Sequence, residues 1–246
     1  MPEQEPSIIH LAETESTNQS LRILLSDGNL PNNSILWADY QTKGRGQAGN
    51  SWESEPGMNL LCSILFYPEL LPANQFFVIA ELAALSVKHT LDRYTSDISI
   101  KWPNDIYWKD KKISGILIEN ELSGALIARS IIGIGINLNQ SGFKSEASNP
   151  VSLNLITGYT YDRKEILDQL HTEFKLLAQE LKDNGVESLH PKYCAALYHR
   201  EGFYSYQDVA GCFEARIHAI ELSGHLILER KDGKTSRYAF KEVVCL

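Results

Sequence analysis

The chain has 246 residues, of which 43% are hydrophobic and 22% charged, the composition of an ordinary soluble globular protein. Its formal net charge of −8 argues against a surface built mainly to bind DNA or RNA, although a local cluster of cations could still bind phosphate. Four scattered cysteines without a C-x-x-C pair, no signal peptide and no long apolar run predict a cytoplasmic protein with reduced thiols that spans no membrane.

The first part of the chain alternates between strand and helix patterns. A helix is expected after Glu15–Asn18, which offers several N-cap residues. Residues 76–94 carry apolar side chains at spacings of three and four, which predicts a helix with one buried stripe. Strands are expected at residues 8–11, 35–38, 59–66, 98–101, 106–108, 113–119 and 130–139, with a charged turn at 109–112.

The remaining part begins with helices and ends in short strands. Asp162–Glu165 resembles a capping box and precedes a helical stripe that continues to Leu181, and a shorter helix is expected over 189–198. Strand-like runs separated by turns follow, which predict a small barrel or sandwich packed on the larger domain. These runs are Val209, 213–220, 226–228 and 238–244. The expected domains are therefore residues 1–200 and 201–246.

A glycine-rich segment, Gly44–Trp52, begins with the dinucleotide-binding pattern G-x-G-x-x-G. That pattern binds a dinucleotide only between a strand and a helix. Here loop-forming residues and then a second strand follow, so the segment is expected to be a loop between two strands and not a Rossmann site. Arg45 lies between two glycines, where its guanidinium can bind carboxylate or phosphate. The alternative is a solvated arginine on a surface loop.

Three further polar positions occur at strand ends. Lys101–Asp105 (KWPND) places a lysine and a tryptophan in a turn that Pro-Asn-Asp alone would explain. Lys112 precedes a buried strand, where it could be a binding residue or only a solubilising charge, and Gly115 within that strand indicates close approach of a ligand or backbone. Asn137 leaves another buried strand and fits a strand-end cap equally well.

The chain has no G-x-S-x-G or H-E-x-x-H motif, and its seven histidines pair with no evident nucleophile, although a triad formed in space stays possible. Cations, amides and glycines without a nucleophile suit activation of a carboxylate by a nucleotide, where positioning and charge neutralisation dominate.

Together these segments resemble the biotin protein ligase family. Five segments agree in order and spacing and cover residues 8–140: Glu15–Asn18, Gln41 with Gly44–Gly46 and Trp52, Lys101–Asp105, Lys112–Leu117 and Gly133–Asn137. The resemblance implies an α/β (α+β) fold, with a catalytic domain of mixed sheet and helices like that of class II aminoacyl-tRNA synthetases. A small SH3-like β-barrel is expected to follow it.

The resemblance also implies an ATP-dependent biotin–[acetyl-CoA-carboxylase] ligase. In this family, biotin and ATP form biotinyl-5′-adenylate with Mg²⁺ present, and a lysine of a biotin carboxyl carrier protein then receives the biotin. The partners implied are therefore biotin, ATP and the carrier protein, without nucleic acid or membrane, and the oligomeric state stays open.

Residue roles follow by motif position, and none of these residues is assigned as a metal ligand. Biotin would contact Ser16, Thr17, Asn18, Gln41, Gly44, Arg45, Gly46, Gln47, Lys112 and Gly115. ATP or the adenylate would contact Arg45, Trp52, Lys101, Asn104 and Asn137. The expected catalytic residues are Arg45, Lys112, Asn104 and Asp105.

Two departures from the family's pattern matter. Gln47 and Asn50 stand where many relatives carry basic residues, so we hypothesise that this loop retains the adenylate less tightly. Only seven residues precede the first expected strand, so the DNA-binding domain of some relatives is not expected and the protein should be monofunctional.

Three alternatives stay open. A lipoate or octanoate transferase shares the catalytic fold, but the segments 44–52 and 101–105 favour biotin. A binding sensor without turnover is disfavoured because Arg45, Asp105 and Lys112 are all present. A tRNA-synthetase-like paralogue is disfavoured by the acidic charge balance and by the lack of an RNA-binding appendage.

Overall fold

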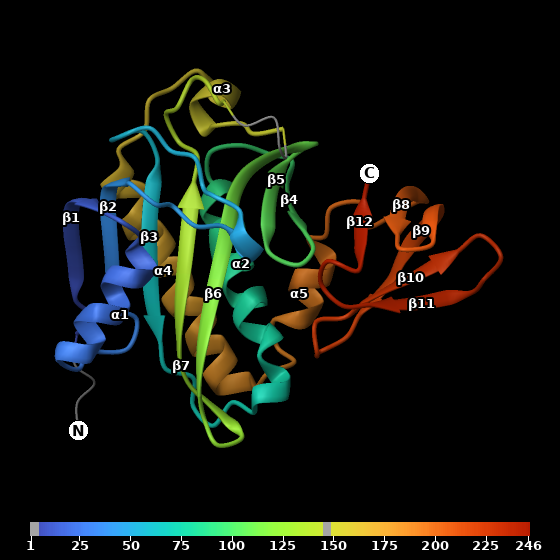
Figure 1. The fold of residues 1–246 in the computed structure, drawn as a ribbon, viewed down its shortest axis with the longest axis horizontal. Coiled ribbons are helices and arrows are strands. Elements are labelled where there is room, and N and C mark those ends of the chain that lie inside the picture. The colour runs from blue at the N-terminus through green and yellow to red at the C-terminus, as the bar shows by residue number, and fades with distance from the viewer. Residues whose placement is uncertain (1–4, 145–148) are drawn as a thin grey trace.

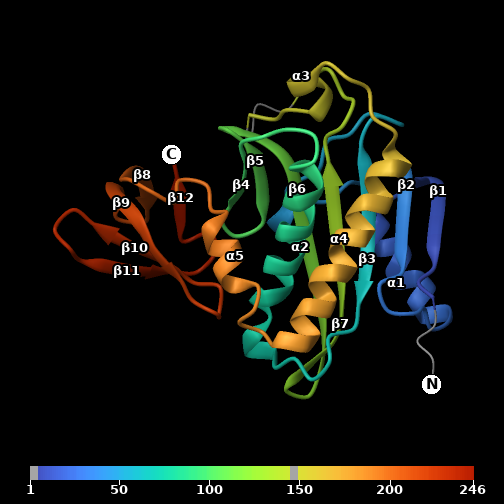
Figure 2. The same cartoon turned by 180° about the vertical axis from the view of Figure 1, so that it is seen from behind.

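The computed structural model describes residues 5–144 and 149–246. These residues form two β-sheets, a large one covered by helices and a small one at the C-terminal end, which lie side by side (Figures 1 and 2). Among the described residues, no helix is both long enough and apolar enough to cross a membrane.

The large sheet has seven strands in the order β1-β2-β3-β7-β6-β5-β4. β1 pairs with β2 in parallel, and all other neighbours are antiparallel, so the sheet is mixed. The strands are β1 (Ile8–Thr14), β2 (Ile35–Gln41), β3 (Leu60–Phe66), β4 (Ile98–Lys101), β5 (Asp105–Trp108), β6 (Lys111–Ser123) and β7 (Leu126–Ile136). Every strand expected in this part of the chain is confirmed, with ends that shift by a few residues.

Helices cover both faces of this sheet. α1 (Thr17–Asp27) lies on one face, and α2 (Phe77–Leu91) and α4 (Arg163–Asn184) lie on the other (Figures 1 and 2). The remaining helical segments are η1 (Gln47–Gly49), η2 (Ala73–Gln75), α3 (Leu153–Thr157) and α5 (His190–Ala195). The expected N-caps are found at Ser16 and Asp162, although only Asp162 uses its side chain, accepting a hydrogen bond from Lys164 N at 2.7 Å.

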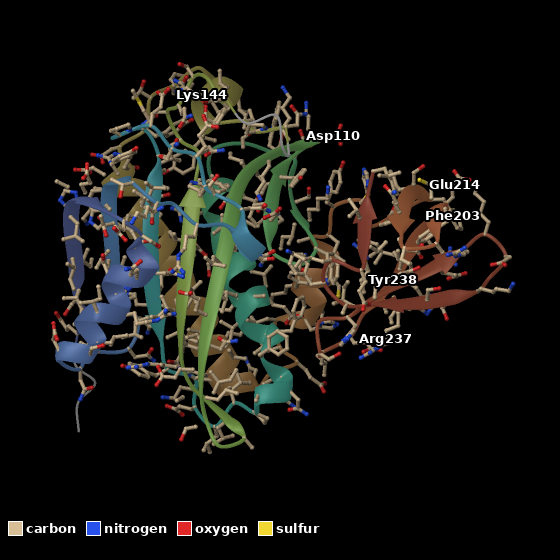
Figure 3. All side chains as sticks on the ribbon, in the orientation of Figure 1. Asp110, Lys144, Phe203, Glu214, Arg237 and Tyr238 are labelled. Carbon is tan, nitrogen blue, oxygen red and sulfur yellow. The ribbon has the colours of Figure 1, made fainter. Side chains whose placement is uncertain are left out.

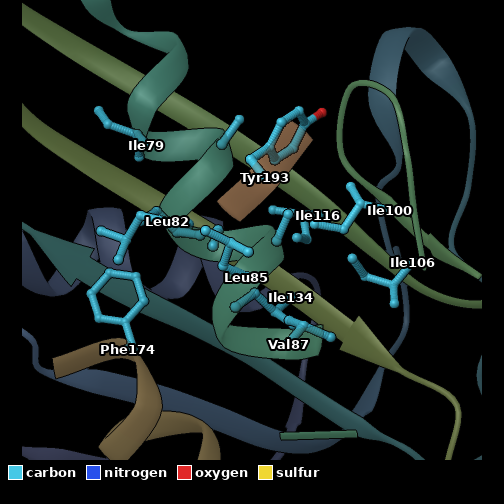
Figure 4. Packing of buried hydrophobic residues seen from close by; sticks show 14 of the residues in the cluster. Ile79, Leu82, Leu85, Val87, Ile100, Ile106, Ile116, Ile134, Phe174 and Tyr193 are labelled. Atoms are coloured by element: carbon cyan, nitrogen blue, oxygen red, sulfur yellow. The ribbon is translucent and has the colours of Figure 1, made fainter. Parts of the chain in front are cut away.

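The expectation of a single buried stripe on α2 is wrong. Every residue from Phe77 to Val87 is buried, because the sheet, α4 and α5 enclose the helix from several sides. Figure 4 shows Leu82 of α2 beside Phe174 of α4, and Leu85 beside Ile116 and Ile134 of the sheet. A helix enclosed on several sides does not need a polar face, so periodicity alone understates its burial.

The small C-terminal sheet has five antiparallel strands in the order β11-β10-β9-β8-β12. They are β8 (Tyr204–Asp208), β9 (Gly211–Ile220), β10 (Leu226–Arg230), β11 (Thr235–Tyr238) and β12 (Val243–Cys245). The expected small β-structure is therefore confirmed. The domain boundary at residue 200 stays a prediction.

Two details of that small sheet were predicted wrongly. Val209 is fully exposed in the turn between β8 and β9 and belongs to no strand. The run 238–244 is not one strand, because residues 239–242 interrupt it between β11 and β12. β8 was missed although its sequence, Tyr-Ser-Tyr-Gln-Asp, alternates tyrosine with polar residues, which is itself a strand pattern.

Candidate functional site

A cavity of about 860 Å³ lies beside the large sheet and extends to the small sheet. Its walls come from the start of α1, the loop between β2 and β3, the turn between β4 and β5, the middle of β6 and β7, and residues of the C-terminal sheet. Within the described part of the chain, every site residue predicted from the sequence lines this cavity except Gly44.

Side chains alternate between the two faces of β6 and β7, so one face packs in the hydrophobic core and the other borders the cavity. Gly115 pairs with Gly135, and the adjacent residues Ile116 and Ile134 pair with each other. Successive side chains of a strand point to opposite faces. The isoleucines are buried beside α2 (Figure 4), and the two glycines line the cavity.

Trp52 lies on the two glycines. A Cβ atom on Gly135 would come within 2.5 Å of the indole Cε2, and one on Gly115 within 2.8 Å of Cζ3. Glycine is therefore required at both positions for the ring to lie against the sheet. The indole Nε1 is buried and finds no hydrogen-bond partner among the described residues. The sequence analysis included Gly135 in the segment Gly133–Asn137 but gave it no role in the site.

The glycine-rich segment is a loop between antiparallel strands, as expected, and not a strand–helix turn. Trp52 N donates to Gly44 O at 3.0 Å, and Gly46 N donates to Asn50 O at 2.6 Å, so the two arms of the loop are bonded to each other. A Cβ atom on Gly44 would lie 2.6 Å from Trp52 O, which explains the glycine there. Gly44 therefore shapes the loop from outside the cavity wall.

Arg45 extends from this loop and forms an ion pair with Glu119 of β6. Its Nη2 lies 3.4 Å from Glu119 Oε1, and the Arg45 side chain is 41% exposed. The Glu119 carboxylate also lies 3.2 Å from Arg22 Nη2 of α1. Sequence reasoning missed Glu119 and Arg22, because neither carries a motif of its own.

A chain of hydrogen bonds runs along the α1 end of the cavity and joins five side chains. We call these residues the polar chain: Gln41, Thr17, Ser63, Asn18 and Glu119. Thr17 N donates to Gln41 Oε1 at 2.8 Å, and Ser63 Oγ lies 2.8 Å from Thr17 Oγ1. Ser63 Oγ also donates to Asn18 Oδ1 at 2.6 Å.

Asn18 Nδ2 completes the polar chain by donating to Glu119 Oε2 at 2.9 Å and to Leu117 O at 3.3 Å. The amide oxygen of Gln41 thus faces Thr17. The polar chain was not foreseen as a unit, although four of its five residues stand in or beside the predicted segments.

Lys112 and Asp105 form the second ion pair of the site. Lys112 Nζ lies 2.7 Å from Asp105 Oδ1, and the two side chains are 19% and 31% exposed. The antiparallel pairing of β5 with β6 brings these residues together. Lys112 Nζ also lies 5.8 Å from the centroid of the Trp52 ring, within the range of a cation–π interaction.

The KWPND turn is fixed from three sides. Asn104 is buried and donates through Nδ2 to Ile116 O. Pro103 O accepts a hydrogen bond from Tyr193 OH at 2.7 Å, and Trp102 Nε1 donates to Gly224 O in the turn between β9 and β10 at 3.0 Å. Trp102 therefore connects the site to the small sheet, and this contact explains why the turn contains a tryptophan.

Lys101 lies at an aromatic end of the cavity. Its Nζ is 5.0 Å from the Tyr107 ring centroid and 5.9 Å from that of Tyr198. The His199 ring stacks on Tyr198 at 3.7 Å, and burial lowers the pKa of His199. Tyr198 OH donates to Asp110 at 2.8 Å, and Figure 3 labels Asp110 at the turn between β5 and β6. None of these wall residues except Lys101 was predicted.

Asn137 is buried just beyond the end of β7. Its Nδ2 donates to Val151 O at 3.2 Å, and its backbone N donates to Ile113 O at 2.9 Å. Its Oδ1 finds no partner among the described residues, while the residue lines the cavity. The Nδ2 atom therefore caps the strand end, while a binding role for the Oδ1 atom stays a prediction.

No group of three or more histidine, cysteine, aspartate or glutamate side chains is placed to hold a metal ion within residues 5–144 and 149–246. Asp105 supplies one carboxylate in the cavity. Mg²⁺ commonly uses only one or two protein carboxylates together with substrate phosphates, so this donor set fits an ion that arrives with a nucleotide.

Known proteins resemble this chain in sequence and in fold. Residues 11–137 match the biotin/lipoate A/B protein ligase family. A biotin–[acetyl-CoA-carboxylase] ligase of Paracoccus denitrificans is 32% identical over 181 residues, which are 71% of this chain and 74% of that protein. The bifunctional ligase/repressor BirA of Bacillus subtilis is 28% identical over 231 residues, which are 91% of this chain and 70% of that protein.

Among solved structures, the biotin protein ligase from Aquifex aeolicus in complex with biotin and ATP superposes with a TM-score of 0.78 and 28% identity, covering 98% of both chains. The matched residues 11–137 include the α1 end of the cavity, both ion pairs and the glycines under Trp52. By sequence and by fold, this chain belongs to the biotin/lipoate A/B protein ligase family.

Proposed function

We propose that this protein is a biotin protein ligase, which activates biotin with ATP and transfers it to a lysine of a biotin carboxyl carrier protein. The observation that carries the proposal is the convergence of Arg45 and Lys112 on one cavity above Gly115 and Gly135. A carboxylate and a triphosphate repel each other, and cations in a sheltered site offset that repulsion. The Paracoccus and Aquifex relatives support biotin and ATP as the two substrates.

The α1 end of the cavity suits the bicyclic head of biotin. Ser16 and Thr17 line the cavity there, and Gln41 Oε1 already accepts from Thr17, which leaves Gln41 Nε2 to face a ligand. Asn18 has its amide oxygen and nitrogen bonded to Ser63, Leu117 and Glu119. We therefore assign Asn18 to holding Thr17 and Ser63 in place instead of contacting biotin through its own polar atoms.

The middle of the cavity suits the carboxylate of biotin and the α-phosphate of ATP. Lys112 would release Asp105 and bind the biotin carboxylate in its place. Arg45 and Gly46 would close over the phosphate. Gly115 leaves space for the acyl chain, with Trp52 and Gln47 as adjoining walls. Trp52 is also a candidate stacking surface for the adenylate.

The remaining predicted residues suit the nucleotide. Lys101 would attract phosphate, Asn104 keeps its Oδ1 after donating to Ile116 O, and Asn137 offers its unpaired Oδ1. After its release from Lys112, Asp105 would contribute a carboxylate ligand to a Mg²⁺ ion that is bound to the phosphates of ATP. Such an ion would neutralise phosphate charge during the attack.

The reaction consists of two displacements. A carboxylate oxygen of biotin attacks the α-phosphorus of ATP, and the bond to pyrophosphate breaks, which gives biotinyl-5′-adenylate. The amine of the acceptor lysine then attacks the acyl carbon, and AMP leaves as the new amide forms. Enclosing the mixed anhydride between the loop and the sheet would shield it from water. We propose residues 1–200 as the catalytic domain and 201–246 as a small domain that completes the cavity wall.

The test is incubation of the protein with biotin, Mg-ATP and a biotin carboxyl carrier domain, followed by measurement of the carrier's mass. We expect a gain of one biotin, lost when ATP is omitted. Biotin-dependent ATP–pyrophosphate exchange isolates the first step. Faster exchange with lipoate than with biotin would favour a lipoate ligase, and tight biotin binding without exchange would favour a sensor.

A further inference from the structure

Glu119 contacts two residues of the cavity wall without being part of that wall. Its carboxylate accepts from Asn18 Nδ2 at 2.9 Å and lies 3.4 Å from Arg45 Nη2. The third contact, at 3.2 Å, is with Arg22 Nη2 of α1. Neither Glu119 nor Arg22 is among the described residues that line the cavity. One carboxylate is thus shared by two guanidinium groups, and of these two arginines only Arg45 lines the cavity.

This sharing affects how readily Arg45 can leave Glu119. An arginine that is the sole counter-ion of a carboxylate must abandon that carboxylate before it pairs with a phosphate. The Glu119 side chain is only 23% exposed, so water replaces a lost cation poorly. Arg22 supplies a second cation, so Glu119 stays paired when Arg45 turns to another anion.

We infer that Glu119 is a positioning residue that holds Arg45 at the cavity, and that Arg22 lowers the cost of transferring Arg45 from Glu119 to the phosphates of ATP. This inference rests on the proposed function, because it assumes that Arg45 binds phosphate. Arg22 and Glu119 act through Arg45 and contact no substrate themselves.

Arg22 is the cleaner residue to test. Glu119 also ends the polar chain, so changing it affects Asn18 as well as Arg45. The Arg22 side chain is 53% exposed, and its ion pair is with Glu119, so its removal should leave the fold and the polar chain intact. Glu119→Gln complements it, because the amide oxygen can still accept from Asn18 while the charge is lost.

The experiment measures KM for ATP and for biotin in biotin-dependent ATP–pyrophosphate exchange. Arg22→Ala leaves Glu119 to Arg45 alone, so KM for ATP should rise roughly three- to fivefold, the effect of one exposed ion pair, with KM for biotin unchanged. Arg22→Gln, which keeps a long side chain, should behave alike. In the double variant Arg22→Ala with Glu119→Gln, no carboxylate holds Arg45, so KM for ATP should return to the value of Glu119→Gln.

Arg129→Ala is the matched control, because Arg129 pairs with Glu121 on the same β6–β7 hairpin at 2.7 Å. Its KM for ATP should equal that of the wild type. An unchanged KM for ATP in both Arg22 variants would overturn the inference. So would a KM for ATP in the double variant that stays above that of Glu119→Gln. A wild-type protein without biotin-dependent exchange would instead contradict the proposed function.

Discussion

Lys112 Nζ and Asp105 Oδ1 lie 2.7 Å apart at the β5–β6 hairpin, so the principal cation of the site is neutralised by the protein's own carboxylate. Under the proposed function, a ligand carboxylate at Lys112 would compete with Asp105 for the ammonium group. Such an exchange would keep the positive charge paired before and after binding, and it would free the Asp105 carboxylate to bind a cation.

Replacing Lys112 by alanine should abolish adenylate formation and leave the fold intact. The substrate carboxylate would lose its counter-ion and Asp105 would repel it, so the rate of ATP–pyrophosphate exchange should fall about 10²–10³-fold. Circular dichroism would check the fold. Lys111→Ala is the control, because Lys111 is the preceding residue, is exposed to solvent and lines no part of the cavity. Near-normal exchange in Lys112→Ala would refute the role assigned here.

Replacing Gly135 by alanine should displace Trp52. The added Cβ would lie 2.5 Å from the indole, so the ring must lift from the sheet and the loop above it must move. We expect about a tenfold weaker affinity for biotin, measured by calorimetry. Gly142→Ala adds the same methyl group where nothing lies within 4 Å, and it should bind as the wild type does. Equal affinities in the two variants would show that the packing of Trp52 on Gly135 does not contribute to biotin binding.

Gln47→Arg should slow the release of the adenylate. Gln47 lines the cavity, and its Oε1 is buried without a partner among the described residues, so a guanidinium there would add a charge beside the phosphate. We expect the dissociation rate of biotinyl-5′-adenylate to fall by about tenfold, measured by a chase with unlabelled biotin and ATP. Gln47→Ala provides the comparison without charge. A rate that stays unchanged in Gln47→Arg would sink the hypothesis.

Acid should destabilise the protein through His171. Burial lowers the pKa of this imidazole below its ordinary value of 6.5, so the unfolded chain binds the proton more readily than the folded one. The stability that His171 contributes is full above pH 6.5 and declines as the pH falls through its lowered pKa. Urea unfolding at pH 7 and pH 5 should therefore show a smaller loss for His171→Gln than for the wild type. His218→Gln, at a half-exposed histidine of the small sheet, is the control.

The strands of the large sheet and the nature of the Gly44–Trp52 loop could be predicted from the sequence, and all predicted site residues except Gly44 line the cavity. Strand periodicity and turn residues are local signals, and the motifs keep their order along the chain. The loop was separated from a Rossmann turn because the second strand could be recognised after it. The same local information placed α1 and α4, whose N-caps are Ser16 and Asp162.

What escaped prediction depends on contacts between distant segments. The pairing of Glu119 with Arg22 and Arg45 requires the register of β6 against α1 and the loop, which no local pattern encodes. The stacking of Trp52 on Gly135 and the aromatic wall around His199 arise in the same way. The nearly complete burial of α2 reflects the placement of α4 and α5 around it.

The hydrogen bond from Trp102 Nε1 to Gly224 O limits how far the chain can be shortened for protein engineering. A version cut near residue 200 would expose the Trp102 indole and the apolar side of Phe77, which packs against Gly224. It would also remove the cavity wall formed by residues such as Tyr206 and Val243. The smallest portable labelling enzyme made from this chain should therefore include both sheets, although every family motif recognised in the sequence lies before residue 140.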